Sequence, residues 1–202
     1  MARKADPELE DRILQAAHKL WRDGGEKALS MRKVAEAART TTPTLYSRFR
    51  NRQEILTALL HRVQHGWTQM IDACQTPQEA AIRCLDYALA HPREYELLYA
   101  DWFGRTTPKG PRANIELMKV KLAQWFGGEP ERYDSLVLAE WAMLHGASML
   151  LITNSVKGEM AQQLRHAYVA SLFAILRQAG IEVPAAVPFA AAPSDRHHIP
   201  GH

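Results

Sequence analysis

The sequence predicts an all-α protein of about nine helices arranged in two domains. Apolar residues recur with the helical period along almost every patterned stretch, and no region alternates as a β-strand would. The two parts of the chain also differ in charge. Residues 1–65 carry 13 Lys/Arg and 8 Asp/Glu, a net +5, and residues 66–202 carry 12 and 14, a net −2, which together give the +3 of the whole chain. A small basic helical domain therefore precedes a larger, slightly acidic one.

Helix-boundary signals divide the N-terminal part of the chain. Gly24-Gly25 is expected to stop the first helix. Ser30 is a suitable N-cap for the second helix, and Asn51 caps the fourth, with Glu54 in the position of a capping box. The four expected helices span residues 7–23, 31–37, 41–49 and 52–74.

Similar signals organise the C-terminal part. Thr76, Pro77 and Glu79 form the expected start of a helix, and Pro92 disfavours helical geometry in the residue before it. The expected helices span residues 77–91, 92–103, 112–126, 131–153 and 159–179. The chain is thereby divided into an N-terminal domain (1–53), a larger helical domain (54–183) and an Ala/Pro-rich tail (184–202) that is expected to be disordered.

Three short helices followed by a long one, in a basic segment, predict a helix-turn-helix domain for DNA binding. In the third helix, Leu45 and Phe49 are spaced i, i+4 and would anchor it to the first two helices. The opposite face is polar, and hydroxyls and threonine methyl groups suit base edges. Its expected members are Thr41, Thr42, Thr44, Ser47 and Arg48. The alternative from periodicity alone is a three-helix packing unit without a nucleic-acid role.

The run from Thr42 to Leu56, TPTLYSRFRNRQEIL, resembles the signature of the TetR family of bacterial regulators. Residues 13–17 and 29–35 match the first two helices of that family in type and spacing, so the resemblance covers about Leu9 to Leu60. It implies a dimeric DNA-binding regulator with a helical ligand-binding and dimerisation domain. The implied base contacts are Thr42, Pro43 and Thr44, and the implied phosphate contacts are Ser30, Tyr46, Arg48 and Arg52.

One position departs from the family pattern. Where the family usually has Gly-Val-Ser in the turn, this chain has Arg39-Thr40-Thr41. Without the glycine, either Arg39 adopts a strained left-handed conformation or the turn differs. The basic side chain of Arg39 is a further candidate phosphate contact.

The second domain has features of a dimerisation and effector-binding unit. Helices 131–153 and 159–179 are apolar over wide faces and would form a four-helix interface between two chains, or else an intramolecular core. The interior is rich in aromatic residues and Met, which suits a small apolar or aromatic effector, although ordinary core packing is the alternative. The candidate effector contacts are Trp67, Tyr87, Tyr99, Trp102, Phe103, Trp125, Trp141, His145 and Met149. No buried charge is evident, so a strongly charged effector is not indicated.

Several classes of protein are disfavoured. No apolar run approaches the length of a membrane span, and the charged N-terminus has no signal-peptide pattern, so a cytoplasmic protein is expected. Cys74 and Cys84 do not form a disulfide framework, and no metal site or cofactor is expected. Catalytic motifs are absent. The leading hypothesis is a ligand-responsive repressor that binds a pseudo-palindromic double-stranded operator as a homodimer; the alternatives are a regulator without a small-molecule ligand and a helical enzyme.

Overall fold

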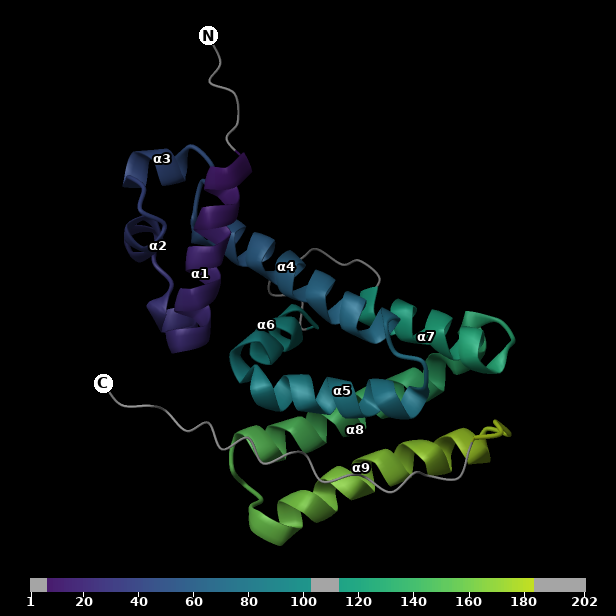
Figure 1. Ribbon diagram of the computed structural model, residues 1–202. Coiled ribbons are helices and arrows are strands. Elements are labelled where there is room, and N and C mark those ends of the chain that lie inside the picture. The colour runs from purple at the N-terminus through teal and green to yellow at the C-terminus, as the bar shows by residue number, and fades with distance from the viewer. Residues whose placement is uncertain (1–6, 103–112, 184–202) are drawn as a thin grey trace.

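The computed structural model describes residues 7–102 and 113–183, and within these ranges the regular secondary structure is all helical (Figure 1). Helices α1 to α3 form a small unit at one end of the molecule, and α4 runs from this unit into the larger one. The all-α prediction is confirmed. The elements are α1 (Pro7–Ala28), α2 (Met31–Ala37), α3 (Thr42–Tyr46), α4 (Arg52–Asp72), α5 (Pro77–Ala90), α6 (Pro92–Trp102), α7 (Ala113–Phe126), the 3₁₀ helix η1 (Pro130–Tyr133), α8 (Asp134–Ile152) and α9 (Gly158–Gln178).

Helix α1 is interrupted where Gly24-Gly25 is predicted to stop the first helix. Gly25 leaves helical geometry with φ 60° and ψ −148°, and a further short helical segment continues α1 to Ala28. A Cβ atom on Gly25 would also lie 3.1 Å from the Arg93 guanidinium of α6. Glycine at this position therefore permits both the left-handed backbone and the close approach of α6.

Helix α3 is shorter than the predicted 41–49. Thr41 is extended and its hydroxyl accepts a hydrogen bond from the Thr44 amide, so it caps the helix and does not belong to it. The helix ends at Tyr46, and the chain then turns so that Phe49, 5% exposed, enters the core. Asn51 is left extended and accepts from the Glu54 amide at 3.0 Å, which confirms the predicted cap of α4.

The larger unit is built from α4 to α9. Thr76 caps α5 by accepting from the Glu79 amide at 3.1 Å, as predicted. The predicted helix 131–153 is in two parts, η1 and α8, and the Tyr133 hydroxyl at their junction donates to the Gly127 carbonyl at 2.6 Å. Helix α8 packs against α5, α7 and α9, and α8 and α9 lie along one edge of the molecule (Figure 1).

One helical segment is strongly apolar. Among the described residues, the segment 130–152 is long and apolar enough to cross a membrane by length and composition alone, a property that the core helix of a water-soluble protein can also have. Glu140 interrupts the apolar run of this segment. Leu138, Met149 and Leu150 are the large apolar residues that it exposes.

Candidate nucleic-acid interface and the inner cavity

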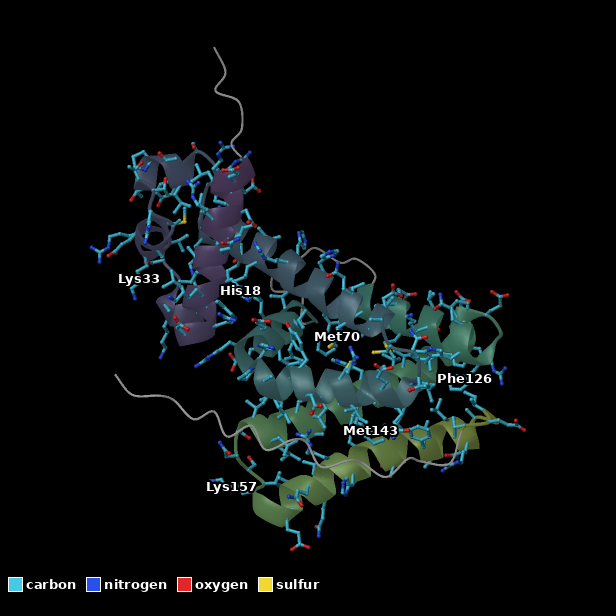
Figure 2. The ribbon with its side chains drawn as sticks, in the orientation of Figure 1. His18, Lys33, Met70, Phe126, Met143 and Lys157 are labelled. Atoms are coloured by element: carbon cyan, nitrogen blue, oxygen red, sulfur yellow. The ribbon has the colours of Figure 1, made fainter. Side chains whose placement is uncertain are left out.

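The first two helices of the motif present a basic outer edge. Ser30 caps α2 by accepting from the Lys33 amide at 3.3 Å, so the hydroxyl lies at an exposed helix N-terminus. Val34 and Ala35 are buried against α1. Figure 2 shows the Lys33 side chain directed away from the molecule. This edge therefore offers backbone amides and positive charge to an anion.

The turn between α2 and α3 takes the first of the two predicted forms. Arg39 has φ 52°, in the left-handed region that a residue with a Cβ rarely occupies. The Thr40 amide donates to the Ala35 carbonyl at 2.9 Å and closes the end of α2. Arg39 is exposed, so its side chain is accessible to a partner.

Helix α3 is anchored on one side and exposed on the other. Leu45 is fully buried beneath it, and Tyr46 beside it is 50% exposed. The hydroxyls of Thr41 and Thr44 lie 2.8 Å apart, and the Ser47 hydroxyl donates to the Thr44 carbonyl at 2.7 Å. These bonds hold the exposed face of a helix only one turn long in a fixed arrangement. Thr42 and Pro43 complete the N-terminal turn, so the predicted base-contacting residues lie together.

The two predicted arginine contacts at the end of the motif differ in their surroundings. Arg48 is half-buried and lines an open hollow with Asn51 and Gln53. Arg52 donates to the Glu26 carbonyl at 3.0 Å and forms an ion pair with the Glu26 carboxylate at 2.9 Å. The Arg52 guanidinium is therefore already held against the end of α1.

A polar junction joins the small unit to the larger one. His18 of α1 lies 2.7 Å from the Glu94 carboxylate of α6, and the Tyr87 hydroxyl of α5 donates to the same carboxylate at 2.5 Å. The Trp21 indole donates to the Arg93 carbonyl at 2.6 Å. Figure 2 shows His18 on the side of α1 that faces the larger unit. No sequence pattern indicates this junction, because His18 and Glu94 are 76 residues apart and Trp21 and Arg93 are 72 residues apart.

Glu94 is kept ionised in this junction although it is only 6% exposed. Burial acts to raise the pKa of Glu94. The hydrogen bonds from His18 and Tyr87, together with the Coulombic interactions of Glu94 with His18 and His91, act in the opposite direction and lower the pKa overall. The expectation that no charge is buried is wrong at this position.

The larger unit contains a partly open cavity of about 40 Å³ between α4, α5, α6, α7 and α8. Three of the predicted effector contacts, Trp67, Tyr99 and Trp141, line it. Tyr87 packs edge-on against Trp67 with ring centroids 5.1 Å apart. His145 stacks on Tyr99 at 3.5 Å, and burial lowers its pKa.

The remaining predicted effector contacts lie elsewhere. Trp125 packs beside the Lys121 ammonium, 5.9 Å away, and does not line the cavity. Met149 is 37% exposed on α8. The Trp102 side chain and Phe103 lie outside the described residues. Two polar residues of the wall, Asn114 and Glu140, were not predicted, because polar residues at single positions of apolar helices give no sequence signal of what they face.

Comparison with known proteins agrees with this description. Residues 13–59 match the family model for bacterial regulatory proteins of the tetR family. Among solved structures, the multidrug binding protein EbrR complexed with ethidium is 20% identical, with a TM-score of 0.60 over 83% of this chain and 99% of that one. TetR from Acinetobacter baumannii AYE is 18% identical, with a TM-score of 0.61 over 87% and 98%. A transcriptional regulator from Rhodococcus sp. Rha1 is 17% identical, with a TM-score of 0.65 over 90% and 100%. Curated proteins give no match to the chain.

The small basic unit, with a buried Leu45 beneath an exposed recognition helix, defines a helix-turn-helix DNA-binding protein. The chain has the fold of these solved regulators over 83% of its length for EbrR and 87% for TetR. The chain is a DNA-binding transcriptional regulator whose residues 13–59 match the tetR family of bacterial regulatory proteins and whose fold is that of the solved TetR structures.

Proposed function

We propose that the protein is a ligand-responsive repressor that binds a pseudo-palindromic operator as a homodimer. The observation that carries the DNA-binding part is the exposed face of α3. Thr42, Pro43 and Thr44 would contact base edges in the major groove. Tyr46, Arg48, Ser30 and Arg39 would contact phosphates. In this arrangement Arg52 mainly fixes α4 to α1 through Glu26, and a phosphate contact would need that ion pair to open.

The dimer is supported by the apolar surface of α8 and α9. Leu138, Met149, Leu150 and Met160 are between 37% and 60% exposed, and these helices lie side by side. A second copy of the pair would cover these side chains in a four-helix interface. Two recognition helices would then meet successive major grooves about 34 Å apart.

The response to a ligand would pass through the junction between the units. Trp67 belongs to α4 and lines the cavity, and it contacts Tyr87, which donates to Glu94, the partner of His18. A ligand that displaced Trp67 would disturb this chain of contacts and move α1 relative to α6. The spacing of the two recognition helices would change, and by linkage ligand and operator would weaken each other's binding.

A second candidate function, regulation by a protein partner without a small-molecule ligand, is favoured by the small size of the cavity. About 40 Å³ is well below the roughly 150 Å³ that holds a benzene molecule in an engineered protein cavity. A regulator controlled by a protein partner needs no larger space. Under the leading proposal the ligand enlarges the cavity by moving its walls, which is the displacement that the response requires.

The DNA-binding proposal is tested with a duplex selected by the full-length protein from a random library. Fluorescence anisotropy should show that Thr44→Ala and Tyr46→Phe each weaken operator binding by about tenfold, the effect of about 1.4 kcal/mol. Thr68→Ala, at a half-buried threonine in the last turns of α4, is the matched control and should bind normally. Normal binding by both α3 variants would refute the assigned interface.

A further inference from the structure

The wall of the cavity combines aromatic rings with two polar side chains to which the rings give no hydrogen bond. Trp67, Tyr95, Tyr99 and Trp141 supply the rings. Asn114 reaches the cavity from the first turn of α7, and Glu140 reaches it from α8. Such a wall suits a flat ligand that also carries a specific polar group.

Asn114 is the first indication of what that polar group is. The residue is 9% exposed, and its Oδ1 atom is buried without a hydrogen-bond partner among the described residues. A buried amide oxygen without a donor costs free energy, so most such atoms in folded proteins are paired. The missing partner of Oδ1 is a hydrogen-bond donor.

Glu140 is the second indication. Its Oε1 atom accepts from the Tyr168 hydroxyl at 2.5 Å. Burial raises the pKa of Glu140, and the hydrogen bond from Tyr168 offsets this in part. In the part of the chain that the structure describes, no Lys, Arg or His forms an ion pair with this carboxyl group. A positively charged donor in the cavity would supply the missing countercharge.

We propose that the effector is a flat aromatic compound carrying an amidine or amine cation, whose N–H groups donate to Glu140 and to Oδ1 of Asn114 while its ring packs among Trp67, Tyr99 and Trp141. This inference rests on the proposed ligand response and names the chemical class of the ligand. It replaces the sequence-based expectation of an uncharged effector. Aromatic faces also attract a cation, so the rings and the carboxyl group favour the same ligand.

The chemical class is tested with three ligands of nearly the same shape and different charge. Benzamidine is a cation with N–H donors, benzamide is neutral, and benzoate is an anion. Titration calorimetry and thermal unfolding of the full-length protein, without DNA, should show benzamidine binding about tenfold more tightly than benzamide, as expected for one charge-assisted hydrogen bond. Benzoate should show no binding.

Substitutions then locate the contact. Glu140→Gln keeps an acceptor for the Tyr168 hydroxyl but removes the charge, and it should abolish the preference for benzamidine over benzamide. Asn114→Leu should weaken benzamidine binding severalfold, by removal of one acceptor. Glu131→Gln in η1 is the matched control, since Glu131 is exposed and does not line the cavity. Unchanged benzamidine preference in Glu140→Gln would overturn the proposal.

Two further outcomes separate this inference from the proposed function. Equal binding of benzamide and benzamidine, with release of the operator by both, would leave the ligand response standing and overturn the cationic class. If none of the three compounds bound and the operator was still bound normally, both the cationic class and the ligand response at this cavity would be overturned. The DNA-binding function would not be affected by that result.

Discussion

His18 of α1 and Glu94 of α6 lie 2.7 Å apart and connect the DNA-binding unit to the larger unit through a nearly buried carboxylate. Glu94 also accepts from Tyr87 and lies on the helix whose Arg93 carbonyl accepts from Trp21. Three hydrogen bonds thus converge on one turn of α6. The orientation of α1 depends on this turn, because α1 and α6 contact each other directly.

The first prediction concerns the charge of Glu94. Glu94→Gln keeps the shape of the side chain and should lower the free energy of unfolding at pH 7 by about 1–3 kcal/mol, the effect of a hydrogen bond to a charged group. The folded-state pKa of Glu94 is lowered, so its stabilisation is present above the unfolded pKa of about 4.3 and is lost as the pH falls through the folded pKa. Urea denaturation as a function of pH measures both effects.

The matched control is Glu96→Gln, two residues along α6. Glu96 pairs with Arg93 at 3.1 Å on the surface, with a side chain 48% exposed, so its loss should cost less than about 1 kcal/mol. The unfolded-state pKa of a glutamate is about 4.3. If the difference in the free energy of unfolding between the wild type and Glu94→Gln did not shrink below that pH, the charge of Glu94 would not be what stabilises the junction.

The second prediction concerns the backbone at Arg39. Because φ is 52° there, Arg39→Gly should raise the free energy of unfolding by about 0.5–1 kcal/mol. Glu36→Gly, inside α2, should instead lower it by about 1 kcal/mol. Thermal or urea unfolding distinguishes the two. A loss of stability in Arg39→Gly equal to that in Glu36→Gly would mean that the left-handed backbone is not strained.

The third prediction concerns the phosphate contact of Arg48. Arg48→Gln should weaken operator binding and make the plot of log K against log salt concentration less steep by about 1 for each subunit. Anisotropy titrations at several salt concentrations give the slope. Arg83→Gln on α5 removes the same charge from a side chain 49% exposed and far from α3 in sequence, and it should leave the slope unchanged. Equal slopes for Arg48→Gln and the wild type would exclude the contact.

The fourth prediction concerns the apolar surface of α8. Leu138→Asp places a charge in the proposed interface and should convert the protein to a monomer in sedimentation velocity, with weaker operator binding. Val120→Asp is the control, since Val120 is 42% exposed on α7 and Leu138 is 47% exposed. A Leu138→Asp protein that stayed dimeric would place the interface on another surface.

The fifth prediction concerns transmission from the cavity to α1. Tyr87→Phe keeps the ring against Trp67 and removes the hydroxyl that donates to Glu94. With benzamidine as the probe, this variant should bind the ligand normally, but the ligand should change operator affinity less than in the wild type. An unchanged effect would show that the coupling does not pass through Tyr87.

The sequence by itself determined the elements that local chemistry specifies. Ser30, Asn51 and Thr76 fix the starts of their helices because each supplies an acceptor to an amide three residues ahead. Leu45 and Phe49 specify which side of the recognition segment is buried, whereas the sequence leaves two forms of the turn open at Arg39 and the structure selects the left-handed one. The caps and the buried side depend on neighbours within a few residues, and so they can be read from the order of residues alone.

The tertiary structure decided what distant segments make together. It shortened α3, brought Glu94 to His18, and placed Asn114 and Glu140 in the wall of one cavity while leaving Trp125 and Met149 outside it. Each of these outcomes depends on how helices pack at their contacting faces, and helical periodicity tells which residues are apolar but not which neighbour they meet. The place of Glu140 in the cavity wall therefore follows only from the packing of the helices around it.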